Sequence, residues 1–226
     1  MIYGADLIVL TAPCSPFSAA GKQRGWSSPA SLPLIKGINL IREVYDDRKG
    51  DLTFLIENVP GAAKYRAIHE SLGEPVRVNA VALGSSASRD TCIWTNAAPV
   101  SAAQKALDSS KQPGLPINDL LRPHGFNDWK SRCETQRYLP KIMAIPGSYR
   151  CSDVGGRKGL GFLLKNGEPM EPSAEIKEIA MGMRPGHTHA PDVSLKDRHR
   201  IVGECLDHNI SRWVFCVLIL AKPTGF

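Results

Sequence analysis

One cysteine lies in a constrained position near the start of this sequence. Cys14 closely follows the apolar run of residues 5–11 and stands between Pro13 and Pro16. Because proline fixes its own φ, we expect the two prolines to stiffen the backbone on both sides of the cysteine. A strand that ends in such a loop places the cysteine at the carboxyl edge of a sheet, where open α/β folds place their sites. A lone cysteine is by default a small buried hydrophobe, but its thiolate is also a nucleophile, so Cys14 is a candidate for covalent chemistry.

A carboxyl group and a guanidinium group are the next candidates. Glu57 ends the apolar run of residues 53–57 and is followed by Asn58, Val59 and Pro60, while Arg89 precedes the run of residues 91–95. A carboxyl group can transfer a proton, and arginine stabilises developing negative charge. The alternatives are a strand-end carboxylate that faces water and a simple surface charge.

Apolar periodicity predicts the elements that position these residues. Strands are expected at residues 5–11, 53–57, 76–83 and 91–95, and a helix with Leu34, Ile38, Ile41 and Tyr45 on one face gives a β-α-β unit. A second helix is predicted near residues 63–72. The expected fold class is therefore α/β.

The rest of the chain changes in character. Residues 97–167 are rich in proline, glycine and polar residues, which is typical of loops with short strands in a recognition region. Helix returns after residue 169, with Ser173 as a predicted N-cap and one long helix over residues 197–221. We therefore predict three parts: a catalytic half-domain (1–96), a recognition region (97–168) and a helical segment that returns to the catalytic domain (169–226).

Composition sets wide limits on function. The chain has 226 residues, is 42% hydrophobic and carries a net charge of +6. Residues 130–165 hold eight basic and two acidic residues, so this stretch alone accounts for the net charge. A solvated basic surface is the ordinary explanation, and a phosphate-facing patch is the sharper one because aromatic residues are interleaved. The apolar run of residues 213–221 is too short to span a bilayer. Six cysteines without a CxxC pair favour a reducing compartment.

Several motifs have plainer explanations. The glycine-rich run of residues 155–161 follows no apolar strand, so a flexible loop is expected there rather than a nucleotide site. His187 and His189 are expected in a turn, and no metal site is predicted. The remaining cysteines are expected to be buried or incidental thiols: Cys92, Cys133, Cys151, Cys205 and Cys216.

The order of these motifs resembles the cytosine-C5 DNA methyltransferase family. The run from Pro13 to Ser18 resembles the family's nucleophile loop, and Glu57-Asn58-Val59 matches its Glu-Asn-Val motif. Residues 86–89 resemble its arginine motif in part, because Thr91 stands where that motif has a second basic residue. Residues 172–183 resemble the helix that closes the recognition region, and residues 200–207 resemble the last motif, with Glu204 in place of its asparagine.

The resemblance implies a fold and a set of roles. The fold would be the second half of a Rossmann-like S-adenosylmethionine-dependent methyltransferase sheet, with a small irregular β-containing recognition region and a C-terminal helix. Cys14 would attack C6 of a flipped cytosine, Glu57 would act on N3, and Arg89 would stabilise charge, so that C5 takes the methyl group. The remaining implied contacts fall in two sets: Ser18, Lys22, Arg150, Arg157 and Lys158 with the DNA, and Pro13, Asn58 and Glu204 with S-adenosylmethionine.

The family's upstream cofactor-binding half has no counterpart in this sequence. The strand of residues 5–11, central in the family, would then be an edge with an uncovered apolar face. We therefore expect weak S-adenosylmethionine binding and a truncated enzyme, or a second chain that supplies the missing half. The resemblance implies double-stranded DNA as the substrate, with the loop of residues 155–161 facing it, and an intracellular location, nuclear in a eukaryote and otherwise cytoplasmic. No membrane partner is expected. A non-catalytic DNA-binding or regulatory remnant and a tRNA cytosine-C5 methyltransferase are the alternatives.

Overall fold

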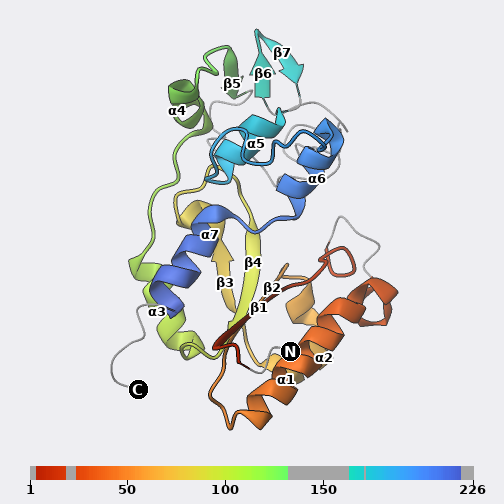
Figure 1. Cartoon of the computed structure of the whole chain (residues 1–226). Helices are drawn as coiled ribbons and strands as arrows, with labels where there is room; N and C mark the ends of the chain where they lie inside the picture. Colours follow the sequence, from red (N-terminus) through yellow and green to blue (C-terminus); the bar gives the residue numbers. More distant parts are fainter. Residues whose placement is uncertain (1–3, 19–23, 132–162, 171, 220–226) are drawn as a thin grey trace. The chain divides into compact units, whose positions relative to one another are not determined.

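The computed structural model describes residues 4–18, 24–131, 163–170 and 172–219. The described chain forms two compact units, each containing segments from distant parts of the sequence (Figure 1). Unit 1 consists of residues 1–78, 90–109 and 215–226, and unit 2 consists of residues 79–89 and 110–214. The predicted functional boundaries at residues 96 and 168 are a separate matter and stay predictions.

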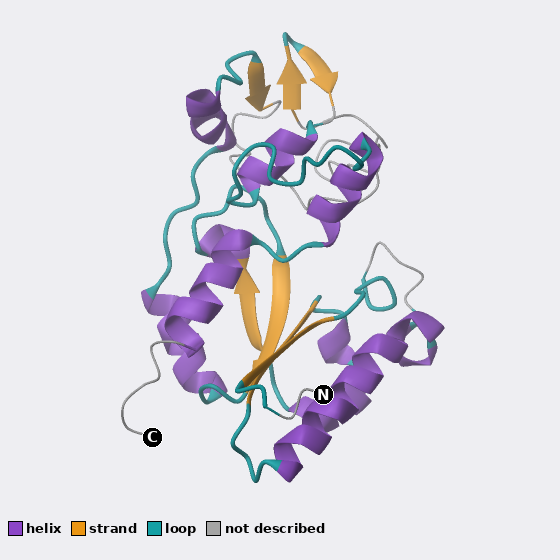
Figure 2. Cartoon of the chain, in the orientation of Figure 1, coloured by secondary structure: helices purple, strands orange, loops and turns teal. Residues whose placement is uncertain are grey.

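Unit 1 is built on a four-stranded sheet with the order β1-β2-β4-β3 (Figure 2). The strands are β1 (Leu7–Thr11), β2 (Thr53–Asn58), β3 (Val76–Asn79) and β4 (Asp90–Thr95). β1 and β2 are parallel, and α1 (Leu32–Asp47) connects them, which confirms the predicted β-α-β unit. β2 and β4 are antiparallel. The predicted α/β class with a partial sheet is confirmed.

Helices pack on this sheet through a continuous apolar core. α1 buries Leu34, Ile38, Ile41 and Val44, whereas Tyr45, predicted on the buried face, is 37% exposed. These side chains pack with Ile68 of α2 (Arg66–Leu72) and with three residues from one face of the sheet: Ile56, Cys92 and Trp94. α3 (Val100–Ser109) lies on the other side of the sheet (Figure 1) and buries Ala103 and Leu107.

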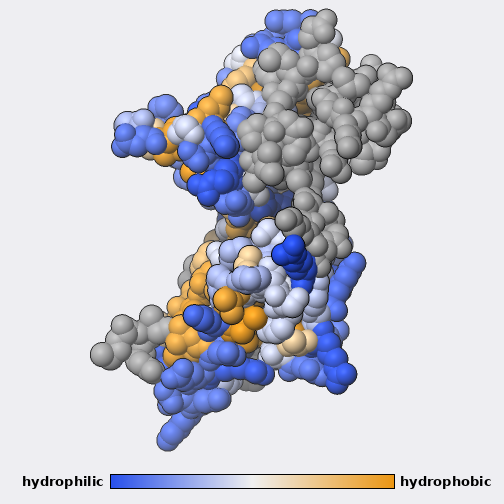
Figure 3. All heavy atoms as spheres, turned by 90° about the vertical axis from the view of Figure 1, so that its right-hand side faces the viewer, coloured by the Kyte–Doolittle hydropathy of each residue, from blue (hydrophilic) through white to orange (hydrophobic). Residues whose placement is uncertain are grey.

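β1 is an edge strand among the described strands of this sheet. It pairs with β2 on one side, and Val9 is 44% exposed. The strand pairing therefore confirms the prediction that this strand becomes an edge. The space-filling view shows an apolar area on unit 1 (orange, Figure 3). An edge strand leaves one row of backbone N–H and C=O groups available for pairing.

Three elements differ from the sequence-based expectations. The third strand ends at Asn79 rather than residue 83, because the Asn79 side chain accepts a hydrogen bond from Val81 N and caps a short 3-10 helix. The helix α3 was not predicted. Its buried apolar residues are Ala103 and Leu107, which lie one helical turn apart, so its apolar periodicity is weak. The predicted long helix over residues 197–221 is wrong: α6 (Leu195–Glu204) ends before Asp207, whose carboxylate caps α7 (His208–Trp213), and a π-helical segment (Val214–Ile219) follows.

Unit 2 combines a small antiparallel sheet with helices. β5 (Trp129–Ser131), β6 (Leu163–Lys165) and β7 (Glu168–Met170) pair in that order, and the helix α4 (Ile117–Leu121) precedes them. Ser173 caps α5 (Ala174–Ala180) as predicted, since its hydroxyl accepts a hydrogen bond from Ile176 N. The unit's core joins these elements and α6 through nine buried residues: Ala87, Ile117, Leu121, Leu163, Ile176, Ile179, Ala180, Met181 and Val202.

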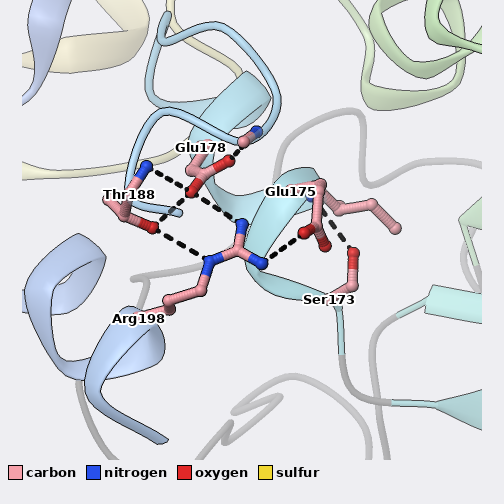
Figure 4. A network of polar contacts seen from close by, with 7 residues as sticks. Ser173, Glu175, Glu178, Thr188 and Arg198 are labelled. Carbon is pink, nitrogen blue, oxygen red and sulfur yellow. Dashed lines mark hydrogen bonds and ion pairs between the residues drawn. The ribbon is translucent and has the colours of Figure 1, made fainter. Parts of the chain in front are cut away.

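A buried charge network fixes the loop between α5 and α6. Glu178 is fully buried and accepts hydrogen bonds from Gly186 N at 2.5 Å, from Thr188 N at 2.9 Å and from the Thr188 hydroxyl. Arg198 lies between Glu178 and Glu175 and bonds both, at 3.1 and 2.5 Å (Figure 4). Burial opposes ionisation of Glu178, but the donors from Thr188, Arg198 and Gly186 outweigh it and hold its pKa below the ordinary value.

Replacing Glu178 by glutamine is expected to lower the free energy of unfolding at pH 7 by about 3 kcal/mol, because a buried cation loses one of its partners. The lowered pKa of Glu178 means that its contribution is present above the ordinary value of 4.5 and is lost as the pH falls through the folded value. Denaturant unfolding should therefore show a difference between the two proteins that shrinks at acidic pH. Glu175→Gln is the matched control, with a loss of about 1 kcal/mol because that side chain is one third exposed; equal losses would contradict the assignment.

The described residues offer neither a membrane span nor a metal cluster. None of their helices is long and apolar enough to cross a membrane, and no group of three potential ligands lies close together among them. Pro185 to Thr188 form a turn, closed by His187 N to Arg184 O at 3.1 Å, so the turn predicted for the two histidines is confirmed. The glycine-rich run of residues 155–161 lies outside the described residues.

Candidate active site

Cys14 begins a tight turn directly after β1. Its carbonyl oxygen accepts hydrogen bonds from Phe17 N at 2.9 Å and Ser18 N at 2.8 Å, and Pro16 O accepts one from Gly25 N at 2.9 Å. We call residues 12–18 the nucleophile loop, after the motif that they resemble. The first two bonds close a turn within the loop, and the third connects the loop to Gly25. The Cys14 side chain is partly exposed. A nucleophile needs this combination of a fixed backbone and an accessible sulfur.

The loop is anchored to unit 1 through one buried aromatic side chain. Phe17 is 4% exposed, belongs to the unit 1 core and meets the Tyr65 ring edge-on at a centroid distance of 5.2 Å. Tyr65 in turn covers Gly25, where a Cβ atom would lie 2.0 Å from the Tyr65 ring. Gly25 also has a φ of +58°, which favours glycine. The position of Cys14 therefore depends on packing three residues further along the chain.

Glu57 lies at the matching end of the neighbouring strand. In the parallel pairing of β1 with β2, Glu57 is opposite Thr11, so the chain turns into the nucleophile loop beside it. The Asn58 amide donates a hydrogen bond to Ala12 O at 3.3 Å, two residues before Cys14. Asn58 is 1% exposed, and its Oδ1 accepts a hydrogen bond from Val59 N at 2.9 Å. The structure thus joins the Glu-Asn-Val segment to the nucleophile loop through a buried amide.

Gly61 brings these two segments into close contact. A Cβ atom at this position would lie 1.9 Å from the carbonyl oxygen of Phe17. The φ of Gly61 is −60°, which any residue adopts, so the requirement for glycine here is one of space. The backbone after the Glu-Asn-Val segment therefore packs directly on the backbone of the nucleophile loop.

Thr91 is a site residue that the sequence did not identify as one. Its hydroxyl contacts Glu57 Oε1 and lies 3.0 Å from the carbonyl oxygen of Asn58. The antiparallel register pairs Glu57 with Ile93, so Thr91 is two residues along on the same face of the sheet. The only sequence signal was the missing second basic residue of the arginine motif at this position.

Arg89 belongs to unit 2, and its described partners are there. Its Nη1 donates a hydrogen bond to Gly203 O at 3.2 Å, and its charge acts on the buried carboxylate of Asp207. Burial raises the pKa of Asp207, and hydrogen bonds from Ser85, Ile210 N and Asn209 N oppose that rise. Arg89 thus interacts with the segment of residues 200–207, and its catalytic role stays a prediction.

The structure describes all three residues predicted to contact S-adenosylmethionine. Glu204 ends α6, is exposed, and lies 3.8 Å from Arg200 as an i,i+4 ion pair. Both polar groups of the Asn58 side chain bond the chain, and Pro13 offers no side-chain polar group. The contacts of these three residues with S-adenosylmethionine stay predictions. The predicted second chain that would complete the pocket stays a prediction.

The predicted nucleic-acid contacts fall mostly outside the described residues. Lys22, Arg150, Arg157 and Lys158 all lie there. Ser18 is described and is 8% exposed, so little of it is accessible to solvent. Its contact with phosphate stays a prediction.

The other described cysteines differ from Cys14 in their chemistry. Cys92 is fully buried in the unit 1 core, and burial raises the pKa of its thiol to about 11. Burial likewise raises the pKa of Cys205 to about 11, and its thiol donates to Val202 O at 3.2 Å. Both are therefore protonated at neutral pH and poor nucleophiles, as expected for structural thiols. Cys216 is exposed, and Cys133 and Cys151 lie outside the described residues.

Comparisons with known proteins agree with this geometry. Residues 2–71, which contain the nucleophile loop and the Glu-Asn-Val segment, match the family model described as C-5 cytosine-specific DNA methylase. No curated protein matches the chain.

Three solved structures share the fold. The Dnmt2 methyltransferase of S. pombe is 12% identical with a TM-score of 0.63, and the match covers 99% of this chain and 80% of that one. A DNMT2 mutant of Spodoptera frugiperda is 13% identical with a TM-score of 0.54, covering 91% and 76% of the two chains. The Entamoeba histolytica methyltransferase EhMeth is 11% identical with a TM-score of 0.56, covering 93% and 77%.

The chain has an α/β fold with a partial sheet. This fold is similar to that of the C5 methyltransferase structures. The cysteine loop and the glutamate segment lie in the residues that the family model matches. Residues 2–71 therefore match the C-5 cytosine-specific DNA methylase family, and the described fold is similar to that of the three methyltransferase structures.

Proposed function

We propose that the chain methylates C5 of cytosine in double-stranded DNA through a covalent bond between Cys14 and C6 of the base. The observation that carries this proposal is the hydrogen bond from the buried Asn58 side chain to Ala12 O. It ties the residue after Glu57 to the loop that holds Cys14. A nucleophile and a proton donor that act on one base must be held at a fixed separation. Gly61 supports the same conclusion, because it packs the two segments backbone to backbone.

The chemistry follows from the two side chains. Cytosine C6 is a weak electrophile until electron density is drawn toward N3. A protonated Glu57 would donate its proton to N3 as the Cys14 sulfur bonds to C6, and C5 becomes the nucleophilic carbon of an enamine. Bound S-adenosylmethionine would supply the methyl group. The C5 proton would then pass to water as the S–C6 bond breaks and the Cys14 thiolate leaves, and the N3 proton would return to Glu57.

The target base must leave the helix for this reaction. C6 of a stacked cytosine is not accessible to a loop sulfur, so the base would have to be flipped into the site. The basic stretch of residues 130–165 would supply phosphate contacts. We choose duplex DNA because the matched family model is that of a DNA methylase.

A trapping experiment tests the reaction and the substrate together. The chain is incubated with S-adenosylmethionine and either a duplex or a tRNA that contains 5-fluorocytosine, whose C5 fluorine cannot leave as a proton does. We expect an adduct with the duplex that survives denaturation. An adduct with tRNA alone would replace DNA by tRNA as the substrate, and salt-sensitive binding without an adduct would favour a non-catalytic remnant.

A further inference from the structure

The Thr91 hydroxyl lies between two hydrogen-bond acceptors at the end of β2. It contacts Glu57 Oε1 and lies 3.0 Å from the Asn58 carbonyl oxygen, and Thr91 itself is 1% exposed. A hydroxyl has one hydrogen to donate and two lone pairs with which to accept. It therefore donates fully to only one of the two oxygens at a time. When it donates to the Asn58 carbonyl oxygen, Glu57 Oε1 can bond the hydroxyl only as a protonated carboxyl.

Two arrangements satisfy this geometry. When Glu57 is ionised, the hydroxyl donates to the carboxylate. When Glu57 is protonated at Oε1, the carboxyl donates to the Thr91 oxygen and the hydroxyl turns its hydrogen to the Asn58 carbonyl. Both arrangements keep the heavy atoms in place, because only hydrogens move.

We propose that Thr91 is a positioning residue that holds Glu57 in one place in both of its protonation states. This inference rests on the proposed function, in which Glu57 gives a proton to the base and receives it back. A basic residue at this position, as in the family's arginine motif, has donors only and would favour the carboxylate. The hydroxyl in this chain can bond either state, and it bonds the carboxylate more strongly than the neutral carboxyl.

Thr91 also connects Glu57 to the nucleophile loop. The Asn58 whose carbonyl faces the hydroxyl donates its side-chain amide to Ala12 O, two residues before Cys14. The chain Thr91–Asn58–Ala12 is buried at its first two members, both 1% exposed. A substitution at Thr91 is therefore expected to affect the Glu57 carboxyl directly. It would affect the position of the nucleophile loop only indirectly, through the Asn58 backbone.

The first test measures the carboxyl directly and needs no catalytic turnover. Carbon-13 NMR titration of Glu57 in the whole chain is compared for the wild type, Thr91→Val and Thr91→Ser. Hydrogen bonds to an ionised group are stronger than those to a neutral one, so we expect Thr91→Val to raise the pKa of Glu57 by about one unit. Thr91→Ser keeps the hydroxyl and should restore the wild-type value. An unchanged pKa in Thr91→Val, or no restoration by serine, would overturn the proposal.

Thr95→Val is the matched control. Thr95 lies on the same strand and face, and its hydroxyl donates to Phe54 O at 2.7 Å rather than to a carboxyl group. Its replacement should leave the pKa of Glu57 unchanged. A shift as large as that of Thr91→Val would show a general effect of hydroxyl loss on the sheet and would overturn the proposal.

The second test measures exchange of the cytosine C5 hydrogen, which needs no methyl donor. Cys14 bonds to C6, N3 gains the Glu57 proton, and C5 takes a proton from water. C5 then loses its tritium to water, the S–C6 bond breaks, and Glu57 regains its proton. With a duplex that carries tritium at C5, Thr91→Val should lower kcat roughly tenfold with KM nearly unchanged, and Thr91→Ser should recover most of it. A loss confined to KM would overturn the proposal.

The two tests separate this inference from the proposed function. If the wild type releases no tritium from duplex DNA or tRNA, the proposed reaction fails, and the pKa of Glu57 alone decides the role of Thr91. If tritium is released and the pKa of Glu57 is the same in the wild type and in Thr91→Val, the proposed reaction is supported and the positioning role of Thr91 is contradicted.

Discussion

Replacing Cys14 by serine is expected to abolish covalent chemistry on cytosine. The hydroxyl of serine is far less acidic than a thiol, so it is a much weaker nucleophile at neutral pH. We expect the rate of tritium release from C5 to fall by on the order of 10³-fold or more. Unfolding of the variant should match the wild type, because the Cys14 side chain is partly exposed and its backbone carbonyl makes the loop's hydrogen bonds.

Cys216→Ser provides the matched control for this change. Cys216 is exposed in the π-helical segment and should be replaced without effect on exchange. Residual exchange in Cys14→Ser at more than about a tenth of the wild-type rate would mean that another group attacks the base. Cys92 and Cys205 are unsuited to that role because burial keeps their thiols protonated.

Replacing Gly61 by alanine is expected to cost both stability and activity. The new Cβ would lie 1.9 Å from the Phe17 carbonyl oxygen, so one of two backbone segments must move. Overpacking of this kind costs about 3 kcal/mol of unfolding free energy. Displacing the Phe17 carbonyl also shifts the turn that begins at Cys14, so exchange should fall about a hundredfold in the molecules that remain folded.

Gly4→Ala is the control for the loss of a glycine. A Cβ atom at Gly4 would meet nothing within 4 Å, so neither unfolding nor exchange should change. Denaturant unfolding and tritium release measured on both variants check the prediction. Wild-type stability in Gly61→Ala would contradict the close contact between the two segments.

Local patterns were sufficient to predict the part of the fold that carries the candidate site. The apolar runs before Cys14 and Glu57 and the helical spacing of Leu34, Ile38 and Ile41 specify a β-α-β unit. Parallel strands joined by a helix present their carboxyl ends at one edge. The adjacency of the two candidate residues therefore follows from sequence.

Contacts set by long-range pairing could not be predicted in the same way. Thr91 meets Glu57 only because β2 pairs with β4 in one particular register, across 34 positions of sequence. The division of the last helix depends on Asp207, whose carboxylate caps α7 and also accepts a hydrogen bond from Ser85 at 2.7 Å. Apolar periodicity contains no information on either contact.

The same limit explains the unexpected surroundings of Arg89. Its motif precedes β4 in the sequence, and this position does not predict which residues Arg89 contacts. The structure assigns residues 79–89 to unit 2, where Arg89 bonds Gly203 O. A short segment between two strands can belong to either unit, and its partners decide which.

Mapping the covalent bond is the most direct test of the central claim that Cys14 is the nucleophile. The adduct between the wild-type chain and a 5-fluorocytosine duplex, formed with S-adenosylmethionine, is digested and analysed by mass spectrometry. We predict a nucleotide attached to the peptide that contains Cys14, and no adduct in Cys14→Ser. An adduct on any other residue, or its persistence in Cys14→Ser, would contradict the account.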